Sequence, residues 1–381
     1  MYLLEHDAKE LLAARDVPVP AGVLVDVAGP APTLLPGPWI VKAQVAAGGR
    51  GKAGGIRKAG TIHAVQAAIS ELSRMEIGGR QVYECRVEQQ IEGAQEAYLS
   101  IMLDSVAAGV RVLIAPRGGV EIEAMAAEPG LLRSAVCDAD ATSISACAAR
   151  LARDIPSPFG SALCAAGKAL AAAFCDYECA LLEINPLFVL PDGGWCAGDV
   201  KMITDDNALP RQSAVAALLG RRASTYPEAH LKRHHGCDYV VVDPEGEIGL
   251  LTTGAGLSMM LIDELRQAGL RPYNFLDVRT GGLRGDPTRL IHVLNWIAEG
   301  PRVKVVLVNI FAGITDLGEF ARLLLAALKA TPRLRVPVVA RLVGNAIETA
   351  HTVLGEAGIP VVRDLDLALA RVREHLRGTA A

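Results

Sequence analysis

The chain has 381 residues, of which 51% are hydrophobic and 21% charged, and its formal net charge is −4. This composition supplies a large hydrophobic core and excludes global disorder, while the small negative charge gives no electrostatic basis for binding nucleic acid or a membrane surface. No secretory signal, Cys-x-x-Cys pair or apolar run of about 20 residues is found, so we expect a cytoplasmic protein of two or three domains.

The first half of the chain combines long strands with a few helices. Alternating hydrophobicity predicts strands at residues 81–90, 95–103, 109–115 and 118–123. Helices are predicted at residues 7–16, 143–154 and 161–175, and from a cap at Thr61 to about residue 74. Because the helices would cover only one side of the strands, we predict an α+β architecture with an antiparallel sheet.

A glycine-rich stretch follows a buried strand at residues 38–45. Five glycines lie within residues 48–55, together with Arg50 and Lys52, and Lys42 precedes them in the strand. Glycines let backbone N–H groups approach an anion closely, and the cations add fixed positive charge. The stretch is neither a Walker A loop nor a Rossmann fingerprint. Its pattern favours phosphate binding over a glycine-rich turn with solvated cations.

Two polar segments follow the predicted helices. Residues 179–190 are predicted to form a pair of strands, in which Pro186 suits an edge or a bend, and residues 199–207 a polar loop. Asn185 and Asp199 would then offer oxygen ligands of the kind that Mg²⁺ prefers, although one such pair occurs in many sheets.

The pattern of predicted strands and helices changes after a charged, His-rich segment at residues 221–236. We interpret this segment as a crossing between domains 1–230 and 237–381. From there, strands and helices alternate, which predicts a parallel, doubly wound sheet. Ligands bind such sheets beyond the C-terminal strand ends. Glycine-containing loops are expected there at residues 253–256, 278–286, 311–315 and 343–345.

Several of these motifs together resemble the β subunit of succinate–CoA ligase. The similarity runs nearly end to end and keeps the order and spacing of unrelated motifs. It is carried by residues 4–9, 48–55, 118–123, 182–187, 205–209, 254–257, 274–278, 308–313 and 344–345.

The resemblance implies an N-terminal ATP-grasp fold and a C-terminal flavodoxin-like CoA-ligase domain, and hence a protein of mixed α/β and α+β class. It also implies that Mg-ATP phosphorylates a histidine on a separate α subunit. That phosphoryl group would pass to a carboxylic acid, and CoA, bound mainly by α, would attack the acyl phosphate.

The resemblance also assigns residues to roles. Glu183 is expected to approach the phosphohistidine and to act with Arg50, while Asn185 and Asp199 match the Mg²⁺ ligands. The nucleotide positions are Lys42, Gly49, Arg50, Gly51, Glu88, Ile91 and Glu96. The positions for the acid substrate are Thr253, Gly313, Ile314 and Thr315. Lys52 is added from its charge alone.

The acid end departs from the family pattern, in which Asn is usual at Thr253 and Val at Thr315. We therefore hypothesise that the acid is a relative of succinate, with malate, citrate or a sulfonated acid as candidates. Arg279 and Arg284 would either bind an extra anionic group or lie at the surface or the α contact. The sequence does not decide whether the nucleotide is ATP or GTP, or whether the assembly is αβ or α2β2.

Two alternatives remain from the sequence. One is a stand-alone ATP-grasp carboxylate–amine ligase, against which the second domain argues. The other is a non-catalytic nucleotide-binding scaffold, which would have no need of Lys42, Arg50, Glu183, Asn185 and Asp199.

Overall fold

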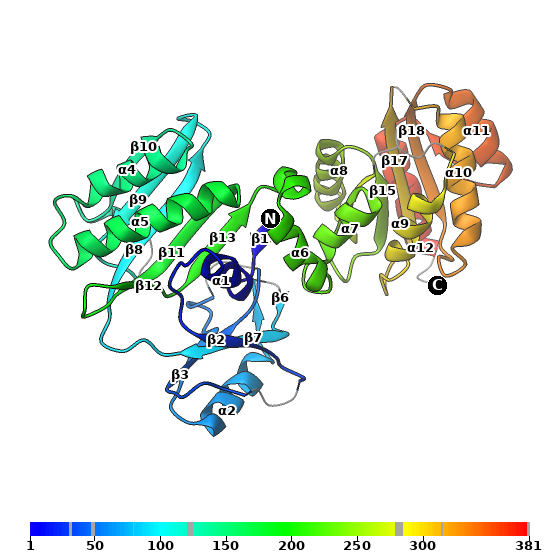
Figure 1. The fold of residues 1–381 in the computed structure, drawn as a ribbon. Helices are drawn as coiled ribbons and strands as arrows, with labels where there is room; N and C mark the ends of the chain where they lie inside the picture. The colour runs from blue at the N-terminus through cyan, green and yellow to red at the C-terminus, as the bar shows by residue number, and fades with distance from the viewer. Residues whose placement is uncertain are drawn as a thin grey trace. The chain divides into compact units, whose positions relative to one another are not determined.

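The computed structural model describes residues 1–29, 33–46, 50–78, 80–119, 125–278, 285–313 and 315–378. The chain divides into two compact units (Figure 1), Met1–Leu218 and Leu219–Ala381, called unit 1 and unit 2 below. The segment predicted as a crossing contains helix α7 (Pro227–His235), whose Leu231 packs on the hydrophobic core of unit 2. The chain thus enters its second unit before residue 230.

The larger sheet of unit 1 has seven strands and is antiparallel, as the sequence predicts. Its strands are β1 (Tyr2–Leu3), β8 (Gln95–Asp104), β9 (Gly109–Ala115), β10 (Arg133–Cys137), β11 (Cys179–Val189), β12 (Trp195–Ala197) and β13 (Val200–Thr204). Helices α4 (Ala141–Ala152) and α5 (Phe159–Asp176) lie along these strands in Figure 1. By length and composition α5 could cross a membrane, but it packs on β8 and β11 as a core helix.

Two predictions in this sheet were wrong. The segment predicted as a strand pair is the single strand β11, and it lies between β13 and β8. Its register against β8 shifts between Ile184 and Leu187, so Pro186, which has no N–H, falls where the ladder is interrupted. The predicted polar loop contains strand β13, whose Val200 and Met202 are buried on alternate positions.

A smaller antiparallel sheet completes unit 1, in the order β2-β7-β3-β4. Thr61 accepts a hydrogen bond from the Ala64 N–H at 3.2 Å, which confirms the predicted helix cap. The remaining elements are α1 (Glu5–Ala13), β2 (Gly22–Asp26), β3 (Trp39–Ala43), β4 (Ile56–Ala59), α2 (Ile62–Leu72), β5 (Glu76–Ile77), β6 (Arg80–Gln81), β7 (Glu84–Gln89), the 3-10 helix Asp206–Arg211 and α6 (Ser213–Arg221), which ends in unit 2.

Unit 2 contains a parallel sheet in the order β15-β17-β18-β19, with hydrophobic clusters on both faces. Val306 and Val308 of β17 enter one cluster and Leu307 the other, as expected for a strand covered on both sides. The strands are β15 (Ile248–Thr252), β17 (Val305–Ala312), β18 (Val338–Gly344) and β19 (Val361–Val362), and the helices are α8 (Ala255–Gln267), α9 (Thr288–Ile297), α10 (Leu317–Ala330), α11 (Ile347–Glu356) and α12 (Leu365–Gly378).

Two strands of unit 2 form a separate antiparallel pair, β14 (Cys237–Val241) with β16 (Asn274–Val278). The expectation that both belong to one parallel ladder was therefore wrong. Side chains join the pair to β15: Asn274 accepts a hydrogen bond from the Leu250 N–H at 2.8 Å and donates one to the Leu250 carbonyl at 2.9 Å. A side-chain amide thus replaces ladder hydrogen bonds between β15 and β16.

Candidate nucleotide site

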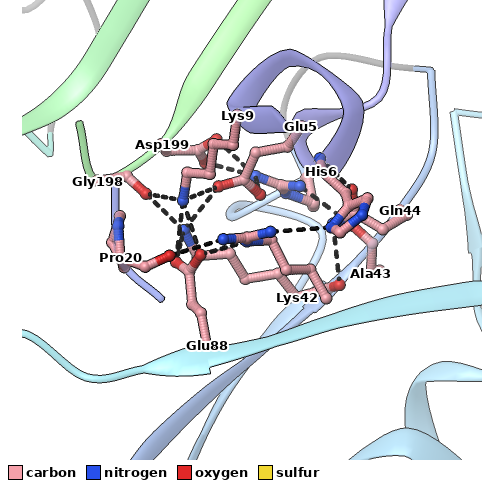
Figure 2. A network of polar contacts seen from close by, with 12 residues as sticks. Glu5, His6, Lys9, Pro20, Lys42, Ala43, Gln44, Glu88, Gly198 and Asp199 are labelled. Carbon is pink, nitrogen blue, oxygen red and sulfur yellow. Dashed lines mark hydrogen bonds and ion pairs between the residues drawn. The ribbon is translucent and has the colours of Figure 1, made fainter. Parts of the chain in front are cut away.

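A buried network of charged side chains lies where the two sheets of unit 1 meet helix α1 (Figure 2). Lys42 comes from β3, and its Nζ contacts Glu5 Oε1 at 2.9 Å and Glu88 Oε1 at 2.7 Å. The same Nζ donates a hydrogen bond to the Gly198 carbonyl at 2.7 Å. Lys42 therefore joins the smaller sheet to the segment between β12 and β13 of the larger one.

Arg50 reaches the same place from the glycine-rich loop. Its Nη2 lies 2.6 Å from both carboxylate oxygens of Asp199 and 2.7 Å from Glu5 Oε2. Its Nη1 donates a hydrogen bond to the Ala43 carbonyl at 3.2 Å, which fixes the side chain against β3. The loop that follows turns back to β4, since the Gly55 carbonyl accepts a hydrogen bond from the Ala43 N–H at 2.8 Å.

Asn185 and Asp199 lie side by side at the edge of this network. The Asn185 N–H donates a hydrogen bond to the Asp199 carbonyl at 3.0 Å, so the two predicted metal ligands are neighbours across β11 and the start of β13. Asn185 Oδ1 accepts a hydrogen bond from the Gly119 N–H at 2.7 Å. The Asp199 side chain keeps 27% of its exposure. One amide and one partly exposed carboxylate are hard oxygen donors, and this donor set fits Mg²⁺.

Glu183 lies two residues before Asn185 on β11. Its Oε2 accepts a hydrogen bond from the Tyr98 hydroxyl at 3.2 Å, and its register partner on β13 is Lys201. Positions two apart on a regular strand share a face, so Glu183 and Asn185 would lie on the same side of the sheet. The register of β11 against β8 shifts between Ile184 and Leu187, however, and Asn185 lies within this irregular part of the strand. Burial raises the pKa of the nearby Tyr2 hydroxyl, which also senses the charge of Arg50.

The other predicted nucleotide positions differ in their surroundings. Glu88 is buried among cations of the network, whereas Glu96 at the start of β8 is exposed and lies against the backbone of Gly119. Ile91 follows β7 and is half-buried. Gly51 and Lys52 are exposed. Gly49 lies outside the described residues, as do Ile314, Arg279, Arg284 and most of the strand predicted at residues 118–123.

Three network residues were not assigned a role from the sequence: Glu5, Lys9 and Arg86. Lys9 Nζ lies 2.8 Å from both Glu5 Oε1 and Glu88 Oε2 and donates a hydrogen bond to the Gly198 carbonyl at 2.7 Å. Arg86 Nε contacts Glu88 Oε2 at 2.6 Å. Spacing was the signal in the sequence that could have found them. Glu5 and Lys9 are one helical turn apart, and Arg86 and Glu88 are two residues apart on a strand, so each pair shares a face.

Electrostatics hold Glu5 and Lys42 in their charged forms. Burial favours neutral Glu5, but Arg50, Lys42 and Lys9 outweigh it and hold the pKa of Glu5 well below its ordinary value. Burial also opposes the charge of Lys42, yet the carboxylates of Glu5 and Glu88 raise the pKa of Lys42 above its ordinary value. Lys42 is therefore a permanent cation at any physiological pH.

The described members of the predicted acid-binding set, Thr253, Gly313 and Thr315, lie in unit 2, at the C-terminal edge of its parallel sheet. Thr252 and Asn309 are register partners in β15 and β17, so the loops that begin at Thr253 and Gly313 emerge from the same edge. The Thr253 hydroxyl oxygen is buried and has no hydrogen-bond partner within the described ranges. The next N–H, of Gly254, donates to Asp277 Oδ1 at 2.7 Å.

Comparison with known proteins agrees with both units. Residues 2–189 match the ATP-grasp domain family and residues 251–374 the CoA-ligase family, which defines an ATP-grasp protein with a CoA-ligase module. The solved ATP citrate lyase of Methanothrix soehngenii superposes with a TM-score of 0.74 over 97% of this chain and 99% of that one, at 18% identity, and so shares its fold.

Relatives of known name are closer in sequence. ADP-forming succinate–CoA ligase subunit beta of Desulfurococcus amylolyticus is 33% identical, over 99% of this chain and 100% of the relative. That of Chloroflexus aurantiacus is 37% identical, over 94% of each chain. The chain belongs to the succinate–CoA ligase β-subunit family. Its enzyme class is therefore that of an ADP-forming acid–thiol ligase.

Proposed function

We propose that unit 1 binds Mg-ATP at the described network and transfers its terminal phosphoryl group to a histidine of a partner α subunit. The observation that carries the proposal is the convergence of Lys42 and Arg50 on the Gly198–Asp199 segment, at 2.7 and 2.6 Å. Two permanent cations beside a set of hard oxygen donors, within an ATP-grasp domain, suit a polyphosphate and its metal ion.

Phosphoryl transfer depends on positioning and charge neutralisation more than on a nucleophile supplied by the protein. Lys42 and Arg50 would bind phosphate oxygens and stabilise the charge that develops on them. Asn185 and Asp199 would hold Mg²⁺, which supplies further charge neutralisation when bound. Arg50 holds both Asp199 oxygens, so it is the residue that must exchange partners when a nucleotide is bound.

Glu183 is proposed to orient the histidine that receives the phosphoryl group. A carboxylate that accepts a hydrogen bond from one imidazole nitrogen fixes the tautomer and leaves the other nitrogen free to attack phosphorus. The Tyr98 hydroxyl donates a hydrogen bond to one oxygen of Glu183 at 3.2 Å and so helps to orient the carboxylate.

The acid substrate is proposed to bind at the strand ends of unit 2, and CoA mainly through the partner α subunit. The Thr253 hydroxyl has no hydrogen-bond partner among the described residues, and this supports the first point, because a buried hydroxyl without a partner is costly and a ligand oxygen would satisfy it. A hydroxyl at this position suits an acid with an added polar group, such as a malate-like, citrate-like or sulfonated relative of succinate.

Labelled ATP tests the phosphoryl transfer. The chain is incubated with γ-labelled ATP and Mg²⁺, with and without its α partner, and acid-labile phosphohistidine is measured on α. Label on α is expected. ATP hydrolysis driven by an amine without α would instead identify a carboxylate–amine ligase, and nucleotide binding without transfer would identify a scaffold.

Steady-state thioester formation by the α–β complex tests the acid. Succinate, malate, citrate and a sulfonated acid are compared by kcat/KM, in the wild type and in Thr253→Val. We expect a more polar acid to exceed succinate, and the variant to lose that preference. A wide preference for succinate in the wild type would reject the substrate hypothesis and leave the ligase assignment intact.

A further inference from the structure

Glu5 occupies the space between the two cations that the proposed function assigns to phosphate. Its side chain is 2% exposed, and its two carboxylate oxygens divide between them: Oε1 contacts Lys42 at 2.9 Å and Oε2 contacts Arg50 at 2.7 Å. A carboxylate bridging two cations presents the same paired, negatively charged oxygens as a phosphoryl group. Glu5 thus takes the place of an anionic ligand.

Groups other than Glu5 also hold the two cations in place. Lys42 keeps Glu88 at 2.7 Å and the Gly198 carbonyl at 2.7 Å, and Arg50 keeps Asp199 at 2.6 Å. The main effect of Glu5 is therefore on charge. Among the ion pairs that join the described residues of the network, four cations face three carboxylates: Lys9, Lys42, Arg50 and Arg86 against Glu5, Glu88 and Asp199. Neutralising Glu5 would double the excess positive charge.

We propose that Glu5 is a resident counter-anion and a specificity-determining residue of the phosphate site, an inference that rests on the proposed function. By satisfying Lys42 and Arg50 before any ligand arrives, it makes binding unfavourable for a bare polyphosphate. A ligand must displace the Glu5 carboxylate, and a nucleotide with its metal ion and base has additional contacts that offset this displacement. Without Glu5, metal-free anions compete for the same cations.

Calorimetric titration with inorganic tripolyphosphate in EDTA tests this role. Glu5→Gln keeps the size of the side chain and removes its charge, and we expect it to bind tripolyphosphate at least about tenfold more tightly than the wild type. Glu71→Gln is the matched control, since it removes an exposed carboxylate paired with Arg57 and changes the net charge equally. Equal affinity in folded E5Q and the wild type would overturn the proposal.

A second variant separates charge from packing and serves if E5Q fails to fold. Lys9→Met combined with Glu5→Gln removes one cation and one anion, so we expect tripolyphosphate affinity within about twofold of the wild type. Tight binding by this double variant would overturn the counter-anion role. Titration of the wild type with Mg-ATP tests the proposed function itself: no binding there rejects the nucleotide site, whatever E5Q does.

Discussion

At the scale of single residues, the candidate site depends on Arg50, whose guanidinium can contact several separated acceptors at once, whereas an ammonium group cannot. Arg50 contacts Asp199, Glu5 and the Ala43 carbonyl at the same time, through two different nitrogens. A planar fork of donors can satisfy such separated acceptors, whereas a lysine offers one compact charge. Arg50 is therefore suited to stay attached to β3 while it exchanges one carboxylate partner.

Arg50→Lys tests this point. We expect Mg-ATP affinity to fall at least about tenfold, and phosphoryl transfer to fall further, because the lysine loses the contacts that orient the charge. Calorimetry and the labelled-ATP assay measure the two effects. Arg302→Lys is the control, since Arg302 forms an exposed pair with Glu245 in unit 2 and should leave both values unchanged. Wild-type behaviour of Arg50→Lys would show that charge alone suffices.

The buried carboxylates predict a pH dependence of stability. The pKa values of Glu5 and Glu88 are lowered from 4.5, because nearby cations outweigh burial in each case. Their contribution is therefore fully present above pH 4.5 and is lost as pH falls through the lower, folded-state pKa values. Denaturant unfolding between pH 3 and 7 should show this loss. Glu88→Gln should lose about 3–5 kcal/mol at pH 7 and show a shallower slope below pH 4.5; an unchanged slope would contradict it.

At the scale of elements, helix α1 shows how far the sequence could predict the site. The Gly-rich loop and the strand before it predicted Lys42 and Arg50 as site residues, because glycines and cations in one stretch favour anion binding over a turn with solvated cations. Glu5 and Lys9 gave no comparable signal, since two charges one turn apart usually mark a solvated helix face. Only the packing of α1 between two sheets reverses that expectation.

Two strands of the larger sheet, β11 and β13, were predicted incorrectly from local sequence. The presence of Pro186 predicted an edge strand or a bend, but Pro186 lies in the central strand β11. The strand can contain it because the register shifts there, and the missing N–H is not needed for pairing. The polar run at residues 199–207 argued for a loop, and pairing of Val200 with Ile184 makes part of it a strand. Pairing partners distant in the chain are not readable from local polarity.

Asn274 provides a test at this scale. Asn274→Leu leaves the N–H and carbonyl of Leu250 buried without their side-chain partners, and we expect a loss of about 1–3 kcal/mol in the free energy of unfolding. Denaturant unfolding followed by circular dichroism measures it. Asn295→Ala, which removes one hydrogen bond to its own helix, should cost less. A smaller loss for Asn274→Leu would show that β15 and β16 are held by packing alone.

At the scale of the whole molecule, the proposed function assigns nucleotide chemistry to one compact unit and acid recognition to the other. The charge network lies wholly within Met1–Leu218, and the loops that begin at Thr253 and Gly313 lie within Leu219–Ala381. Each unit has its own hydrophobic clusters. Ligands of the two kinds should therefore be distinguishable by where they protect the backbone.

Hydrogen–deuterium exchange of the full chain measures this. Mg-ATP is expected to slow exchange in α1, β3 and β7, which carry the network, and at the start of β13. The acid substrate, added to the α–β complex, is expected to slow exchange after β15 and β17. Protection of the unit 2 loops by Mg-ATP in the isolated chain, with none in α1, would contradict the assignment. AMP, which lacks the distal phosphates, is the control ligand and should protect less.

The continuous central strand β11 has a practical consequence for anyone redesigning this enzyme. Glu183 is paired on both sides, with Ser100 of β8 and Lys201 of β13, and Asn185 follows two residues later in the same strand, so their spacing is set by β11 and not by a loop. Mutant libraries aimed at altering nucleotide preference will therefore return more folded, active clones when they vary residues 51–54 and hold β11 constant.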